Sequence, residues 1–461
     1  MPHEPRSSPE QVLPEEALQA LGKIEDAADV VVGIPSYNNA RTIGHVVQAA
    51  QAGLAKYFPQ LKAVIINSDG GSSDGTRDSV MASTLEKSTL LFLSTPLYPV
   101  HRLSLPYHGI SGKGSAFRLV FQLAERLGAK ACAVVDADLR SITPEWIDLL
   151  LRPVLHAGFD FVAPYYHRHK FDGTITNSII YPLTRALYGL RVRQPIGGDF
   201  GMSQRLFSRY LQRNDWETDA ARFGIDIWMT TIALAEGYRV CQSFLGAKLH
   251  NAKDPGADLS DMLRQVVGSV FTLMQEYQQV WKARAASEEV DLFGFRFGVG
   301  LDPVNVNVDR MLKSFRMGCQ DLGEIWERAL RPETHAAVLE MGRDSSQGKP
   351  FHMEDELWAR IIMDFAVAYK WQPVERGYLL RSLTPLYLAR VASFVVEARD
   401  LIAEEVEQRI ERLCLCFEQL KPDLIGRWDH APGPASQARR SSEKPQEKLA
   451  SAVSLEVRSY D

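Results

Sequence analysis

The amino-acid sequence predicts an α/β fold, with a mostly parallel, Rossmann-like sheet followed by an α-helical C-terminal domain. Short apolar runs alternate with amphipathic helical patterns between residues 29 and 164, which is typical of parallel strands joined by helical crossovers. Beyond about residue 257 the pattern is helical almost throughout. A chain of 461 residues can bury both a sheet core and a helical core.

Five apolar runs in the first part of the chain have strand character, at residues 29–35, 62–67, 90–93, 131–135 and 159–164. Between them we expect helices over residues 42–57 and 113–127, one helix capped by Asp74, and one opened by Thr143 and Pro144. The later helices are expected at residues 259–283, 304–330, 354–369 and 379–420.

These patterns divide the chain into four parts. We expect an N-terminal arm over residues 1–28, the α/β domain over residues 29–256 and the helical domain over residues 257–428. Residues 429–461 are rich in Pro, Ser, Gln and Lys, so a disordered tail is expected there.

Charge and composition exclude several classes of protein. The 52 basic and 57 acidic residues give a formal net charge of −5. The sequence lacks a basic block of the kind that nucleic-acid-binding proteins carry. The N-terminus has no apolar signal core, and no uninterrupted apolar run approaches the ~18 residues of a membrane span. The five cysteines are scattered, and the Cys414-Leu-Cys416 spacing does not fit zinc. We therefore expect a cytoplasmic protein with reduced cysteines and no membrane or nucleic-acid partner.

Asp136 and Asp138 follow the apolar run at residues 131–135 directly. Two carboxylates at positions i and i+2 after a strand can point toward one location, where they offer hard oxygen ligands. Ligands of open α/β sheets bind at the carboxyl ends of the strands. The pair therefore predicts a site for Mg²⁺ or Mn²⁺ that contacts a nucleotide diphosphate.

Two further segments have the chemistry of a nucleotide site. Asp69 lies in a Gly-rich turn after the second apolar run, where its carboxylate can accept a hydrogen bond from a base. Lys113, in Gly112-Lys-Gly114, places a cation and free backbone N–H groups at the start of a helix, which suits a phosphate. The segment is not a P-loop, because Tyr107 and Gly114 replace the glycine and the hydroxyl residue of that motif.

Taken in order, these segments resemble the GT-A glycosyltransferases. The resemblance rests on Pro35-Ser-Tyr-Asn-Asn39, Asn67-Ser-Asp-Gly-Gly-Ser-Ser-Asp-Gly-Thr76, Gly112-Lys-Gly114 and Asp136-Ala-Asp138. Residues 166–176, 194–198, 223–226 and 247–250 are similar to mannosylglycerate and glucosylglycerate synthases, and more loosely to glucosyl-3-phosphoglycerate synthase. The resemblance spans roughly residues 30–280.

The resemblance implies a set of site residues. Asp226 and Lys113 are expected to take part in catalysis, with Asp226 holding hydroxyls of the donor sugar and Lys113 the diphosphate. The metal is expected on Asp136, Asp138 and His250, with Asp138 the more direct ligand. The nucleotide sugar is expected to contact Pro35, Tyr37, Asn39, Asp69, Lys113, Asp136, Ala137, Ile196, Gly197 and Asp226.

For the acceptor, the resemblance points to Arg168, Asp172, Gly173 and Thr176. An arginine can bind a carboxylate through two hydrogen bonds, and Asp and Thr can bind hydroxyls, which fits D-glycerate. The phosphoglycerate enzymes carry an arginine where this chain has Thr174. A phosphorylated acceptor stays open, since His167, His169 and Lys170 supply other cationic groups.

We therefore expect a retaining hexosyltransferase that moves glucose or mannose from a nucleoside diphosphate to the 2-hydroxyl of D-glycerate. The alternatives are transfer to 3-phosphoglycerate, a sugar nucleotidyltransferase, and a nucleotide-sugar sensor without catalysis. The nucleotidyltransferase would need a Gly-rich loop after the first strand, where this chain has Pro35-Ser-Tyr-Asn-Asn39. The helical domain is expected to complete the acceptor site, to form a homodimer interface, or both.

Overall fold

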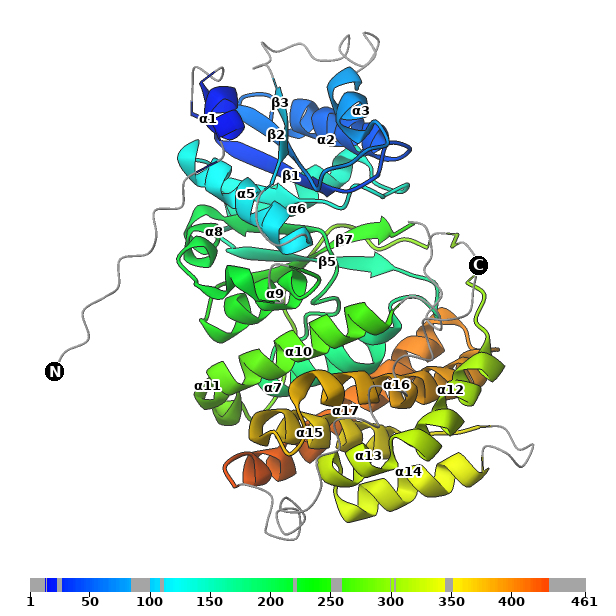
Figure 1. The fold of residues 1–461 in the computed structure, drawn as a ribbon. Coiled ribbons are helices and arrows are strands. Elements are labelled where there is room, and N and C mark those ends of the chain that lie inside the picture. The colour runs from blue at the N-terminus through cyan, green and yellow to red at the C-terminus, as the bar shows by residue number, and fades with distance from the viewer. Residues whose placement is uncertain are drawn as a thin grey trace, which may run out of the picture. The chain divides into compact units, whose positions relative to one another are not determined.

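A computed structural model describes residues 13, 15–22, 27–83, 100–107, 112–218, 222–249, 259–298, 300–301, 304–344 and 351–430 (Figure 1). The chain folds into two compact units. The first comprises Met1–His169, Leu190–Ala252 and Ser287–Pro303, and the second comprises Lys170–Gly189, Lys253–Ala286 and Val304–Asp461. The division therefore does not follow one cut near residue 256, because the chain enters the second unit at Lys170 and leaves it again.

The first unit is built on an eight-stranded sheet in the order β3-β2-β1-β4-β6-β5-β7-β8. Only β6 runs antiparallel to its neighbours β4 and β5, and the other pairs are parallel, which confirms the predicted mostly parallel sheet. The strands are β1 (Val30–Ser36), β2 (Ala63–Asp69), β3 (His101–Pro106), β4 (Ala131–Val134), β5 (Phe161–His167), β6 (Phe200–Ser203), β7 (Val240–Ala247) and β8 (Leu292–Phe293).

Four of the five predicted strands coincide with β1, β2, β4 and β5, with ends that differ by at most three residues. The predicted strand at residues 90–93 lies outside the described residues. Strands β3, β6, β7 and β8 were not predicted: β8 has only two residues, and β3, β6 and β7 each carry polar residues or glycine among their apolar residues.

Helices cover both faces of this sheet. They are α1 (Glu15–Leu21), α2 (Ile43–Tyr57), α3 (Thr76–Ala82), α5 (Lys113–Arg126), α6 (Pro144–Ala157), α8 (Gln204–Leu211), a 3₁₀ turn η2 (Asp215–Glu217) and α9 (Ile225–Ala235). Thr143 and Pro144 open α6 as predicted. Helix α3 begins one residue later than expected, with Gly75 at the cap position, and Asp74 accepts hydrogen bonds from the Thr76 backbone and hydroxyl at 3.1 and 2.5 Å.

Close packing explains why the central strands are apolar along their whole length. On one face Val30, Val32 and Ile34 of β1 join a core with residues of α2 and α6. On the other face α5 lies so near β1 that a Cβ atom on Gly33 would stand 2.5 Å from a methyl group of Val120. Both faces of β1 are therefore excluded from water.

The direction of the strands sets where the functional side chains collect. Strands β1, β2, β4, β5 and β7 all end at the same edge of the sheet, as their parallel registers require. Because β6 is antiparallel, its first residue Phe200 pairs with Val134 at the end of β4. Residues just before β6 therefore meet residues just after β4, and the carboxyl end of β7 lies at the same edge.

The second unit is helical. Its elements are a π-helical turn η1 (Thr176–Ile180), α7 (Tyr181–Tyr188), α10 (Ser260–Glu276), α11 (Gln278–Ala283), α12 (Val308–Asp321), α13 (Gly323–Ala329), α14 (Pro332–Asp344), α15 (Asp355–Trp371), α16 (Arg376–Ala398) and α17 (Ala403–Trp428). The helix predicted at residues 379–420 was wrong as a single helix: the chain turns between α16 and α17. Helix α14 was not predicted.

Helix α16 is long and apolar enough to cross a membrane by length and composition alone. Its most apolar window is 78% buried inside the described structure, however, as expected for the central helix of a bundle.

Buried ion pairs attach α7 to this helical unit. Arg185 of α7 is fully buried and donates hydrogen bonds to Glu411 at 2.5 and 2.8 Å and to Glu418 at 2.8 Å, both on α17. Lys421 of α17 donates to the Leu187 carbonyl of α7 at 3.1 Å. These contacts explain why residues 170–189 leave the sheet unit.

Candidate functional site

Acidic and basic side chains alternate at the carboxyl edge of the sheet in the first unit. Asp136, two residues after β4, holds one lysine on each carboxylate oxygen: Lys113 Nζ lies 2.7 Å from Oδ1 and Lys248 Nζ lies 2.7 Å from Oδ2. Lys113 also lies 3.3 Å from the carboxylate of Asp226 on α9. The structure thus brings together Lys113, Asp136 and Asp226, three of the residues that the resemblance assigns to the site.

Asp199 is fully buried next to Asp136 and Lys248. Its Oδ1 accepts a hydrogen bond from the Asp136 backbone N–H at 2.8 Å, and its Oδ2 accepts from Lys248 at 2.8 Å and from the Tyr166 hydroxyl. Because Asp199 bonds both the backbone of Asp136 and the lysine on its carboxylate, it fixes the position of Asp136.

The buried charges shift one another's pKa values. Burial alone would raise the pKa of Asp136, but Lys113 and Lys248 outweigh it and hold that pKa far below its usual range. Burial raises the pKa of Asp199 and of Asp226 against the opposing attraction of the lysines. Burial disfavours the charged forms of Lys113 and Lys248, yet their neighbouring carboxylates raise both pKa values. Three carboxylates thus share two ammonium groups.

Gly197 and Gly198 allow this close approach. Gly198 has a φ of +93°, and a Cβ atom there would stand 2.3 Å from Oδ2 of Asp136. A Cβ on Gly197 would stand 2.2 Å from the Pro164 ring. The backbone carbonyl of Gly197 accepts a hydrogen bond from Lys248 at 2.7 Å. Only glycine leaves room for the carboxylate at this turn.

A second cluster of polar side chains lies at the ends of β1 and β2. Asp69 is buried, and its carboxylate accepts hydrogen bonds from the Ser36 hydroxyl at 2.9 Å, the Ser72 hydroxyl at 2.6 Å, and the Gly71 and Ser72 backbones at 3.1 and 2.9 Å. A carboxylate has about four acceptor positions. Asp69 therefore organises the turn that follows β2, and in this geometry its acceptor positions are already used.

The other predicted nucleotide contacts surround that turn or the lysine pair. Pro35 lies in β1. Tyr37 is 65% exposed, and its backbone N–H donates to the Asn39 side chain at 2.9 Å. The carbonyl of Ala137 accepts from the Thr42 hydroxyl at 2.8 Å. Ile196 is half-buried beside Gly197.

The described residues provide one carboxylate suited to a divalent cation. Asp138 is half-buried and makes no hydrogen bond or ion pair with the residues that the structure describes, so its oxygens can ligate a hard cation. Both oxygens of Asp136 already contact a lysine. No group of three His, Cys, Asp or Glu side chains that could hold a metal occurs among the described residues, and His250 lies outside them. The residues fit a cation held jointly by Asp138 and the oxygens of a phosphorylated ligand.

The predicted acceptor residues are divided between the units. Arg168 belongs to the first unit, where its guanidinium lies 5.4 Å from the ring centre of Tyr166. Asp172, Gly173 and Thr176 belong to the second unit. There the Asp172 carboxylate accepts from the Gly173 backbone at 2.7 Å, and Thr176 begins the π-helical turn.

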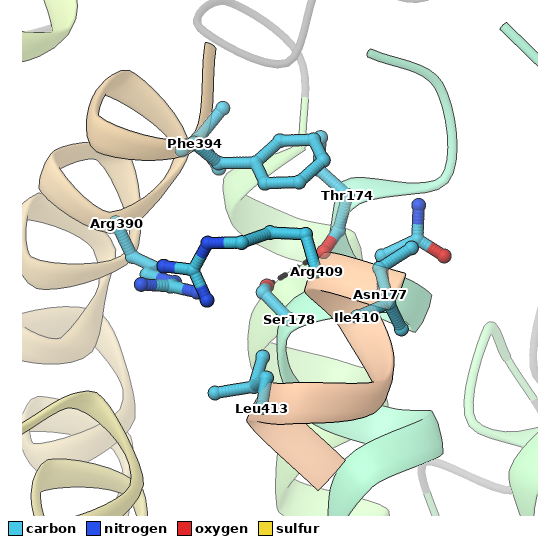
Figure 2. A pocket seen from close by; sticks show the side chains of 9 residues that line it. Thr174, Asn177, Ser178, Arg390, Phe394, Arg409, Ile410 and Leu413 are labelled. Atoms are coloured by element: carbon cyan, nitrogen blue, oxygen red, sulfur yellow. Dashed lines mark hydrogen bonds between the residues drawn. The ribbon is translucent and has the colours of Figure 1, made fainter. Parts of the chain in front are cut away.

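A pocket of the second unit lies on the same turn. Figure 2 shows Thr174, Asn177 and Ser178 facing it, together with Arg390 of α16 and Arg409 of α17. The two arginines share Asp355, which accepts from Arg390 at 2.6 Å and also from Arg409, and Arg409 donates to Glu397 at 2.8 Å. The remaining lining is apolar, with Val391, Phe394, Ile410 and Leu413. The arginine charges are compensated within the unit, so the pocket indicates no ligand by itself.

Lys248, Asp199 and Tyr166 were not singled out as site residues from the sequence. Lys248 directly follows β7 and Asp199 directly precedes β6. The available signal was a charged residue directly beside a mostly apolar segment, but these two segments were not recognised as strands. Without the antiparallel placement of β6, nothing in the sequence joins Asp199 to Asp136.

No protein-family model matches the chain, and no curated protein matches it either. Among solved structures, the chain is similar to glucosyl-3-phosphoglycerate synthase from Mycobacterium tuberculosis in complex with Mn²⁺, UDP and glucosyl-3-phosphoglycerate, with 21% identity over 58% of this chain and 86% of that one, and a TM-score of 0.40. The same protein in complex with Mg²⁺ and UDP gives 20% identity over 59% and 85%, with a TM-score of 0.40. Values this low do not establish a shared activity.

Proposed function

We propose that this chain is a GT-A-type glycosyltransferase that transfers a hexose from a nucleoside diphosphate to a glycerate-type acceptor, with the help of a divalent cation. The observation that carries the proposal is the arrangement of Lys113, Asp136 and Asp226 beside Gly197 and Gly198 at the carboxyl edge of the sheet. Ligands of open α/β sheets bind at this edge.

Lys113 is suited to hold a departing diphosphate. It is the first residue of α5, where free backbone N–H groups and the helix dipole favour an anion. Apart from its ion pair with Asp136 it makes only long contacts, at 3.3 Å to Asp226 and 3.4 Å to the Gly198 carbonyl. Its ammonium can therefore turn toward a phosphate by giving up one short contact, the ion pair with Asp136.

Asp226 is suited to hold hydroxyl groups of a donor sugar. Its side chain is 13% exposed, and its Oδ1 lies 3.3 Å from Lys113 Nζ but accepts no hydrogen bond from the described residues. A buried carboxylate oxygen that accepts no hydrogen bond is unfavourable, and a sugar hydroxyl supplies a donor.

The charge balance supports a requirement for a cation. Three carboxylates share two lysines, so the two lysines alone do not balance them when all are ionised. A diphosphate adds further negative charge. A divalent cation on Asp138 would offset this charge and stabilise the leaving group when bound.

In the proposed reaction, the acceptor 2-hydroxyl oxygen bonds to the anomeric carbon while the bond from that carbon to the diphosphate oxygen breaks. The hydroxyl proton passes to the departing diphosphate, and attack from the same face retains the anomeric configuration. The assignment of the acceptor carboxylate to Arg168, and of its hydroxyls to Asp172 and Thr176, is carried over from the resemblance in the sequence alone.

The test is a mass-spectrometric screen of labelled UDP-glucose and GDP-mannose against D-glycerate and 3-phosphoglycerate, with Mg²⁺ or Mn²⁺. A glycoside of D-glycerate supports the proposal, and a glycoside of 3-phosphoglycerate supports the alternative acceptor. Pyrophosphate release from a nucleoside triphosphate and a sugar phosphate would indicate a nucleotidyltransferase. Binding of the nucleotide sugars without turnover would indicate a sensor.

A further inference from the structure

Lys248 forms an ion pair with Asp136, one of the carboxylates that the sequence assigns to a metal. Its Nζ lies 2.7 Å from Oδ2 of Asp136, 2.8 Å from Oδ2 of Asp199 and 2.7 Å from the Gly197 carbonyl. An ammonium group has three donors, and all three are used. The side chain is 4% exposed, so the ammonium is held in place.

Lys113, the other lysine on Asp136, is held differently. Only its contact with Oδ1 of Asp136 is short, at 2.7 Å, and its side chain is 15% exposed. Lys113 can leave Asp136 to meet a phosphate, whereas Lys248 would have to break three short contacts to do so. Lys248 is therefore the permanent positive charge on Asp136.

A permanent ammonium group and a divalent cation repel each other at one carboxylate, and the repulsion grows as the site is withdrawn from water. We propose that Lys248 prevents a divalent cation from using Asp136 in the free protein, so that the cation binds together with a nucleotide diphosphate and not before it. The inference rests on the proposed function. Phosphate oxygens then supply the ligands and the negative charge that Asp136 cannot offer while Lys248 neutralises it.

The test measures Mn²⁺ binding by calorimetry and by electron paramagnetic resonance, with and without UDP and without any acceptor. In the wild type, UDP should tighten Mn²⁺ binding by about tenfold or more. A tenfold change in affinity, about 1.4 kcal/mol, is large enough to distinguish binding that depends on UDP from binding that does not. In Lys248→Met, Mn²⁺ should bind without UDP about tenfold more tightly than in the wild type, and the effect of UDP should shrink. Unchanged Mn²⁺ affinity in Lys248→Met would overturn the proposal.

Removal of Lys248 also leaves Asp199 buried without its cation, which can impair folding. The double variant Lys248→Met with Asp199→Asn removes one charge of each sign and leaves the net charge of the site unchanged. An asparagine can still accept the Asp136 backbone N–H. If Lys248 competes at Asp136 itself, the double variant should also bind Mn²⁺ more tightly than the wild type. A gain in the single variant alone would show that only net charge matters, and would overturn the proposal.

Lys130→Met is the matched control. Lys130 also pairs with a carboxylate of the first unit, Asp29 at 2.8 Å, but it is 67% exposed and remote from Asp136 in the sheet register. Its removal should leave Mn²⁺ binding unchanged. If the wild type fails to bind Mn²⁺ even with UDP, the cation requirement of the proposed function fails as well. If it binds Mn²⁺ with UDP and Lys248→Met gains nothing, only the present inference fails.

Discussion

At the scale of single residues, the site depends on how closely charged groups can approach Asp136. The carboxylate is enclosed by Lys113, Lys248 and the backbone of Gly198. Each of these groups is specified by a different part of the chain. A small change at any of them alters the position of a buried charge, which is costly when its partner is lost.

Gly198→Ala should impair both stability and ligand binding. The added Cβ would stand 2.3 Å from Oδ2 of Asp136, at a backbone φ of +93°. We expect a loss of roughly 2–4 kcal/mol in the free energy of unfolding and a marked loss of nucleotide-sugar affinity. Denaturant unfolding and calorimetry measure these effects. Gly128→Ala is the control, because Gly128 has a φ of +71° and open space around its Cβ position; equal losses in both variants would contradict the role of the Asp136 contact.

The ionisation of Asp226 should determine how kcat/KM falls at acidic pH. Burial raises the pKa of Asp226, so the carboxylate takes up a proton at a higher pH than an ordinary aspartate. As the pH falls through that raised pKa, kcat/KM should decrease. Asp226→Asn should lower turnover about 100-fold or more at neutral pH without unfolding the protein. A profile that stays flat down to the usual aspartate range would contradict the assignment.

At the scale of elements, contacts from helix ends connect segments that lie far apart in the sequence. Lys421 of α17 donates to the carbonyls of Leu187, near the end of α7, and of Arg284, just after α11, at 3.1 and 2.5 Å. These carbonyls lie where a helix leaves acceptors without intrahelical partners. A single buried lysine thereby joins three helices of the second unit.

This contact predicts a pH dependence of stability. Burial lowers the pKa of Lys421 from its ordinary 10.5 to about 8. Between these two values the unfolded chain binds more protons than the folded one, so the free energy of unfolding attributable to Lys421 should rise with pH. Comparing the wild type with Lys421→Met by urea unfolding at pH 7.5 and 10, we expect the difference to shift in favour of the wild type by roughly 2–3 kcal/mol. A difference independent of pH would contradict this.

At the scale of the whole molecule, the two units exchange segments. Residues 170–189 come from the middle of the sheet unit but belong to the helical unit. All eight residues of α7 are buried, and Arg185 within it pairs with α17. The segment that carries the predicted acceptor residues Asp172, Gly173 and Thr176 is therefore stabilised by helices more than 200 residues away.

A truncation after Pro303 should consequently not yield a stable sheet domain. It would expose the apolar surface of α7 and leave Arg185 without Glu411 and Glu418, which favours aggregation. A truncation after His430 is the control: it removes residues 431–461, which lie outside the described residues and within the tail that the sequence predicts to be disordered, so the unfolding temperature of the full chain should be retained. Size-exclusion chromatography and thermal unfolding test both. A monomeric, cooperatively unfolding 1–303 fragment would show that α7 does not need the helical unit.

The sequence by itself determined the class of fold and the parallel strands β1, β2, β4 and β5, because apolar periodicity is a local property. Placement at a helix start and a strand end singled out Lys113 and Asp136, whereas Asp226 was named only through the resemblance to GT-A glycosyltransferases. Other features depended on the tertiary structure. The antiparallel course of β6 brings Asp199 to Asp136, and the end of β7 brings Lys248 to the same carboxylate. Such pairings join residues 49 to 112 positions apart, and strand order, which no local pattern encodes, decides them.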